Sequence, residues 1–85
     1  MYPKVKKGMV CKKLGEEAML YDPSSENVHV LNATSLFIWN LLDGLTAPVQ
    51  IEKKMREAFS VSENTDILGD VIRTINEFDQ KDLLE

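Results

Sequence analysis

The sequence contains few of the residues from which metal centres, disulfides and nucleophilic active sites are built. Its 85 residues include one cysteine, Cys11, and one histidine, His29. A single cysteine cannot form an internal disulfide, which favours a reducing, cytoplasmic location. Zinc needs several converging ligands, so we expect no metal at either residue. We expect Cys11 to be a small buried strand residue, with His29 at most its neighbour across strands.

Two further shortages exclude other classes of function. The four glycines are scattered singly, so no glycine-rich phosphate loop is present. The carboxylates fall in a predicted turn and on exposed helix sides, and a core this small cannot frame the cleft that paired acid–base carboxylates require. We therefore expect no enzyme activity and no cofactor. The formal net charge of -4 argues against nucleic acid as a partner.

Long apolar runs are also absent. No such run follows the basic residues 1–8, so we expect neither a signal peptide nor a membrane span, and no membrane partner. A lysine group is expected to form a solvated end, with attraction of an acidic peptide as the alternative; it consists of Lys4, Lys6, Lys7, Lys12 and Lys13. With 44% hydrophobic and 28% charged residues, the composition is that of a folded soluble protein. A chain of 85 residues has room for little more than one domain, so we expect a single domain over residues 1–85.

Hydrophobic periodicity predicts three strands followed by three helices. Turns at Gly15-Glu16 and Asp22-Pro23-Ser24-Ser25 connect the strands into an antiparallel meander. Such a sheet is too small to be stable without a layer against its apolar face, which the helices supply. The predicted fold is therefore α+β. We expect strands at residues 9–13, 18–21 and 26–31, and helices at residues 33–43, 49–59 and from 64–66 onward.

Residues 28–44 contain the junction between the third strand and a strongly apolar helix. Asn32 is a suitable N-cap for that helix, and Gly44 is the expected stop. Trp39 lies among apolar neighbours, which favours core packing over a role as an interface anchor. On the strand, we expect His29 to face outward if Val28 and Val30 face the helices.

The third helix carries a buried stripe at helical spacing. Four apolar residues form the stripe, and Leu68 and Ile72 widen it. Gly69 interrupts the helix, and either it is tolerated there or another backbone approaches it closely. We expect Asp66 near the start of the helix, Val61 tucked into the preceding loop, and Leu83-Leu84 as a last apolar contact. The stripe consists of Ile67, Val71, Ile75 and Phe78.

The order and spacing of several short motifs resemble the PqqD family over nearly the whole chain. The most recognisable are Leu31-Asn32-Ala33-Thr34, Ile38-Trp39 and Leu41-Leu42-Asp43-Gly44. They are preceded by Leu14-Gly15-Glu16-Glu17-Ala18 and Leu20-Tyr21-Asp22-Pro23, and followed by Phe59-Ser60-Val61, Asp70-Val71 and Leu83-Leu84. The chain departs from the family pattern at Ala47, where Thr is usual, at Thr74, where a large apolar residue is common, and at Asp82, which replaces a frequent Gly.

The resemblance implies a winged-helix-like fold and a role in peptide recognition. In the family, the leader segment of a ribosomally made precursor peptide adds as a strand to the third strand and packs against the third helix. The protein then presents the leader to a modifying enzyme, often a radical S-adenosylmethionine enzyme. An exposed strand edge suits this role, because its unpaired amides and carbonyls can bind a peptide.

The predicted peptide site combines the third strand with one margin of the third helix. Arg73 is expected to pair with an acidic leader residue, and Thr74 changes which leader side chain fits. Periodicity alone does not decide which margin of the helix faces the peptide. The site residues are Asn27, Val28, His29, Val30 and Leu31 from the strand, and Ile67, Asp70, Val71, Arg73 and Thr74 from the helix.

Two alternatives to a peptide-binding chaperone remain open. A winged-helix DNA-binding module would need exposed basic residues on the third helix, which offers only Arg73 before Lys81. A structural dimerisation module would pair the third strand with that of a second copy. A monomer or a weak homodimer is compatible with the peptide-binding role.

Overall fold

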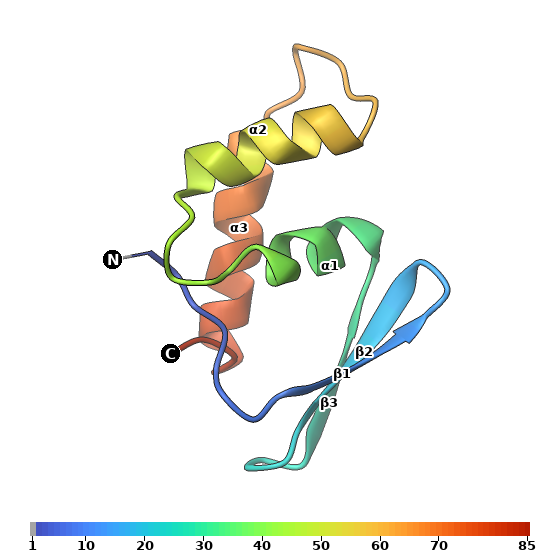
Figure 1. Cartoon of the computed structure of the whole chain (residues 1–85), viewed down its shortest axis with the longest axis vertical. Coiled ribbons are helices and arrows are strands. Elements are labelled where there is room, and N and C mark those ends of the chain that lie inside the picture. The colour runs from blue at the N-terminus through green and yellow to red at the C-terminus, as the bar shows by residue number, and fades with distance from the viewer. Residues whose placement is uncertain (1) are drawn as a thin grey trace.

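A computed structural model describes residues 2–85, and its elements follow the predicted order (Figure 1). The predicted α+β fold is confirmed: a three-stranded antiparallel sheet is followed by three helices. Met1, the first of the basic residues 1–8, lies outside the described residues. The elements are β1 (Val10–Leu14), β2 (Glu17–Asp22), β3 (Asn27–Leu31), α1 (Ala33–Asn40), α2 (Pro48–Ala58) and α3 (Ile67–Gln80).

The sheet has β2 at its centre, with β1 and β3 paired antiparallel on either side. A two-residue turn joins β1 to β2, and Gly15 supplies its positive φ of 65°. A four-residue turn joins β2 to β3, in which the Glu26 N–H donates to the Asp22 carbonyl at 2.7 Å. Among the described residues, β1 and β3 therefore each keep one edge without a neighbouring strand.

One face of the sheet packs on the helices. Ala18 and Leu20 of β2 are fully buried there, and Leu31 of β3 is 5% exposed. His29 is paired with Leu20, so it points to this same inner face. His29 was expected to face outward if Val28 and Val30 faced the helices; that condition is not met, because both valines are exposed and His29 is half-buried.

Helix α1 begins as predicted but ends three residues early. The Asn32 side chain accepts a hydrogen bond from the Ser35 N–H at 2.9 Å, which confirms the N-cap. After Asn40 the chain turns to meet the N-terminal segment: the Val5 N–H donates to the Leu42 carbonyl at 3.0 Å, and the Gly44 N–H to the Pro3 carbonyl at 3.0 Å. Because residues 42–44 pair with this segment, they do not continue the helix.

Helix α3 packs on both α2 and α1. Pro48 is the first residue of α2, after the N-cap Ala47. The four-residue stripe of α3 is buried as predicted, whereas Ile72 is 45% exposed and does not widen it. The Asp66 side chain caps α3 by accepting from the Gly69 N–H at 2.9 Å. A Cβ atom at Gly69 would collide with that carboxylate, so the close neighbour of Gly69 is the cap of its own helix, and not another backbone.

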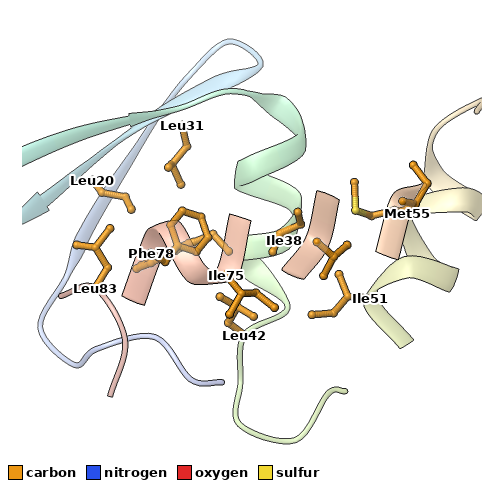
Figure 2. Close-up of a cluster of buried hydrophobic side chains, with 12 residues drawn as sticks. Leu20, Leu31, Ile38, Leu42, Ile51, Met55, Ile75, Phe78 and Leu83 are labelled. Carbon is orange, nitrogen blue, oxygen red and sulfur yellow. The ribbon is translucent and has the colours of Figure 1, made fainter. Parts of the chain in front are cut away.

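The core lies between the sheet and the helices (Figure 2). Trp39 is 6% exposed and packs edge-to-face on Phe78 with ring centroids 5.3 Å apart, so its predicted core role is confirmed. Leu83 is fully buried and extends the core beyond α3, as predicted. The buried cluster consists of Leu20, Leu31, Ile38, Trp39, Leu42, Ile51, Met55, Ile67, Val71, Ile75, Phe78 and Leu83.

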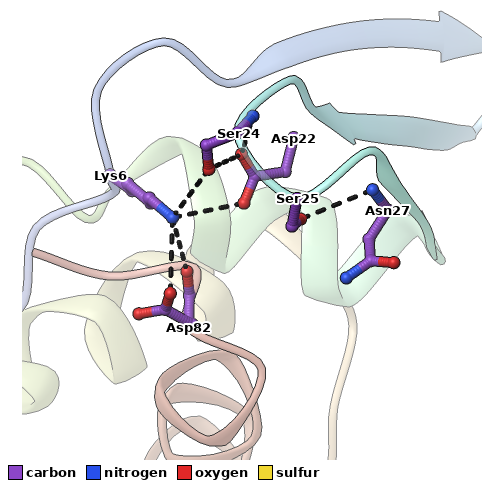
Figure 3. Close-up of polar contacts among 6 residues, drawn as sticks. All are labelled: Lys6, Asp22, Ser24, Ser25, Asn27 and Asp82. Carbon is purple, nitrogen blue, oxygen red and sulfur yellow. Dashed lines mark hydrogen bonds and ion pairs between the residues drawn. The ribbon is translucent and has the colours of Figure 1, made fainter.

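A polar cluster ties the two ends of the chain to the β2–β3 turn (Figure 3). The Lys6 Nζ donates to Asp22 Oδ2 at 3.3 Å, Asp82 Oδ2 at 3.4 Å and Ser24 Oγ at 3.2 Å. Lys6 is therefore not part of a solvated end. Asp82 has a φ of 59°, a conformation that glycine adopts most cheaply, but only a side chain can make the pair with Lys6.

The carboxylate of Asp22 is held in its charged form. A hydrogen bond from the Ser24 hydroxyl at 2.7 Å, a second from the Ser24 N–H and the pair with Lys6 lower the pKa of Asp22 to about 2. The hydrogen bond to Asp22 also raises the pKa of Lys6. Charged Asp22 and charged Lys6 thus stabilise each other across segments distant in sequence.

The packing of the core predicts that alanine substitutions at two apolar residues of α2 differ greatly in their effect on the free energy of unfolding. Ile51 is fully buried, whereas Val49 is 57% exposed. We expect Ile51→Ala to lower the free energy of unfolding by about 2–5 kcal/mol, through lost burial and the cavity left behind. Val49→Ala should change it by less than about 0.5 kcal/mol. Urea unfolding followed by circular dichroism measures both, and equal losses would contradict the described packing.

Asp22 predicts a specific acid sensitivity. Its folded pKa of about 2 lies below the ordinary aspartate value, so its stabilising contribution is complete above about pH 4 and is lost as the pH falls through about 2. We expect the urea midpoint of the native protein to fall more steeply between about pH 5 and pH 2 than that of Asp22→Asn. Parallel slopes would show that Asp22 does not couple protonation to folding.

Candidate functional site

The pairing register determines which backbone groups of β3 are free. The two-residue turn Gly15-Glu16 is closed by a hydrogen-bonded pair, and the direction of the backbone groups alternates from there along β2. By this alternation Leu20 directs its N–H and C=O toward β3 and engages its partner His29. Val28 and Val30 then direct their N–H and C=O groups to the open edge.

A groove lies beside the end of β3, between the start of α1, one side of α3 and the loop between α2 and α3. Its volume is about 580 Å³. Four predicted site residues of α3 line it, namely Ile67, Asp70, Arg73 and Thr74. The margin of α3 that faces the groove is thereby identified. The other lining residues are Asn32, Thr34, Ser35, Ile38, Met55, Phe59, Ser60, Val61, Thr65 and Glu77.

The groove has an apolar floor and a polar rim. Ile38 and Met55 reach it from the core with little exposed surface. On the rim, Arg73 donates to the Asp70 carboxylate at 2.7 Å within the same helix. Both side chains are about half or more exposed, so this ion pair contributes little to stability and can open. The rim can thus exchange an internal ion pair for one with a ligand.

Not every predicted site residue can touch a ligand through its side chain. Val71 is fully buried on the core face of α3, so a contact role for it is withdrawn. The Leu31 side chain is also buried, which leaves its strand with Val28 and Val30 as the exposed apolar residues. The burial of these two side chains leaves the free backbone groups of Val28 and Val30 at the edge of β3 unaffected.

The loop at one end of the groove is held by Arg56 of α2. Its guanidinium donates to the Thr65 carbonyl at 2.7 Å and to the Ser62 carbonyl at 3.3 Å, and it pairs with Glu52 at 3.3 Å. Val61 lines the groove and is 37% exposed, so the prediction that it is tucked in is wrong. The sequence carries no signal for this loop, because its position depends on an arginine in another element.

Cys11 and His29 do not form a site. The two residues pair with Leu20 of the central strand from opposite sides, so they are not neighbours. Cys11 is exposed, so the prediction that it is buried is wrong. The Nε2 atom of His29 is buried and has no hydrogen-bond partner among residues 2–85. Over the same residues, no group of three or more potential ligands could hold a metal ion, and no helix is long and apolar enough to cross a membrane.

Comparisons with known proteins agree with this architecture. Residues 17–84 match the family model described as coenzyme PQQ synthesis protein D (PqqD). The chain is similar to a solved structure of TbiB1 in complex with the TbiA(beta) leader peptide, with a TM-score of 0.81 and 24% sequence identity, covering 96% of this chain and 94% of that chain. At this identity the likeness is one of fold. No curated protein matches the chain.

Proposed function

This chain belongs to the PqqD family, and from that premise we propose that it captures the leader segment of a ribosomally made precursor peptide. The observation that carries the proposal is the open edge of β3 beside a groove of about 580 Å³. TbiB1, which shares the fold, was solved with a leader peptide, and this supports the same class of ligand here.

In the proposed mode, the leader adds to the sheet as a fourth strand. Its backbone forms hydrogen bonds with the free N–H and C=O groups of Val28 and Val30. These bonds supply affinity that does not depend on the side chains of the leader. The three strands already form a twisted ladder, so the edge is fixed before the peptide arrives and little ordering cost falls on the protein.

The groove then reads the side chains of the leader. Apolar leader residues would seat over Ile38, Met55 and Ile67, while Asp70, Arg73 and Thr74 contact polar positions. Arg73 can leave Asp70 for an acidic leader residue because their pair is exposed. The small Thr74 leaves room where a large apolar residue is common in the family, which selects a bulkier leader side chain.

The protein would act as a carrier and not as a catalyst. It presents the bound leader to a modifying enzyme, for which we propose one of the radical S-adenosylmethionine type, and needs no cofactor of its own. The DNA-binding alternative is weakened because Arg73 points into the groove beside two carboxylates, Asp70 and Glu77. Pairing of β3 with a second copy would use the same edge as the leader, so the two would compete.

Two proline variants test the strand edge. Val30→Pro removes an N–H that points outward, so the fold should survive and leader affinity should fall by about tenfold or more. His29→Pro removes an N–H bonded to β2 and should instead destabilise the sheet. The measurement is fluorescence anisotropy of a labelled leader from the precursor encoded beside this chain, with circular dichroism as the folding control. A folded Val30→Pro protein with native affinity would exclude this edge.

A second pair of variants tests the groove. Thr74→Trp should fill the groove and weaken leader binding by about tenfold, because the indole occupies the space in which the leader side chains bind. Asn76 is exposed on α3 outside the groove, so Asn76→Trp is the matched control and should bind normally. If both variants bind like the native protein, the leader does not use the groove.

A further inference from the structure

The face of the sheet that points away from the helices is apolar. The register places alternate residues of all three strands on this outer face, and several are largely exposed: Val30 by 67%, Val10 by 53% and Val28 by 52%. The outer face comprises Val10, Leu14, Met19, Tyr21, Val28 and Val30, together with the charged Lys12 and Glu17. Figure 1 shows the three helices gathered on the other side of the sheet.

This apolar character is unusual for a solvent-facing sheet. An antiparallel sheet with one covered face normally places polar residues on the other. Here Val10, Tyr21 and Val28 form one continuous row across the strands, and Met19 and Val30 lie side by side in the next. An exposed apolar row of this kind is one sign of a protein–protein contact.

The size of the outer face argues against a second copy of the chain as its occupant. Three strands of about five residues cover roughly 15 Å by 15 Å, on the order of 200 Å². A stable dimer buries about 800 Å² on each partner. The face alone is therefore too small to hold any partner stably, a second copy included, and a partner that docks there needs further contact area beside it.

The outer face is continuous with the proposed peptide edge. Val28 and Val30 have their free backbone groups on that edge and their side chains on the outer face. A leader bound as a fourth strand would place its own alternate side chains beside them. A bound leader thus widens the outer face and adds residues that only the loaded protein presents.

We propose that the outer face is the surface on which the modifying enzyme docks, and that the enzyme contacts the carrier and the bound leader together. This inference rests on the proposed leader-binding function. The chemistry of the face specifies its partner: an apolar surface with a carboxylate placed opposite Lys12, the basic residue at the β1 side of the face. Because the leader completes the contact, enzyme and leader strengthen each other's binding.

Neighbouring lysines of β1 provide a matched test. Lys12 is on the outer face and Lys13 on the inner face, and both are exposed, so Lys12→Glu and Lys13→Glu make the same charge change on opposite sides of one strand. Val10→Glu adds a test of the apolar row, with Leu45→Glu, at a residue 81% exposed outside the sheet, as its control. None of these four residues lies on β3 or lines the groove at α3.

The experiment measures leader affinity first and enzyme binding second. The probes are the labelled leader and the purified modifying enzyme encoded with the precursor, and enzyme binding is measured with and without leader. We expect all four variants to bind leader normally, and Lys12→Glu and Val10→Glu to bind the enzyme about tenfold more weakly than their controls. In the native protein, leader should tighten enzyme binding severalfold.

The possible results separate this inference from the proposed function. Normal enzyme binding by Lys12→Glu and Val10→Glu would overturn the outer-face inference and leave leader capture intact. Enzyme binding indifferent to leader would overturn the shared contact. A stable dimer that Val10→Glu dissociates would assign the face to a second copy. Failure of the native protein to bind any leader would instead overturn the proposed function.

Discussion

The structure depends on one packing constraint: three short strands can bury only one face against the helices that follow them. Leu20 and Leu31 meet the helices on that face, and Trp39 and Phe78 fill the space beneath. A three-stranded sheet is not stable alone, so this contact decides whether the fold exists. Among residues 2–85 it leaves the β3 edge and the outer face of the sheet without a neighbouring element, and the proposed roles of the molecule use these two surfaces.

The helices contribute a second kind of opening. Helix α3 buries its stripe against the core, and its adjacent side, with Asp70 and Thr74, lines the groove opposite the start of α1. The groove that results lies next to the end of β3, where the chain passes through Asn32 into α1. The junction between β3 and α1 therefore places the strand edge beside the groove. This arrangement suits a ligand that needs both backbone pairing and pockets for its side chains.

Much of this architecture could be predicted from sequence because it is local. Turn residues, the N-cap Asn32, the start of α3 beside Asp66 and the α3 stripe each depend on a few neighbouring residues, and all were found where expected. The errors arose where distant segments meet. Helix α1 ends early because residues 3–5 pair with residues 42–44, and Lys6 is bound because Asp22 and Asp82 converge on it. Alternation along β3 separates His29 from Val28 and Val30 but does not say which set faces the helices. The orientation of His29, and with it the apolar outer face, therefore depended on the pairing register.

In the proposed binding mode, the leader peptide adds to β3 and lies along the groove. The most direct measurement is an NMR titration of the 15N-labelled protein with the leader of the precursor encoded beside it. Strand addition at β3 predicts shifts concentrated at Val28, Val30 and the groove side of α3, with Val30 gaining protection from solvent exchange as its N–H acquires a partner. Shifts centred on the β1 edge, or none with that leader, would contradict it.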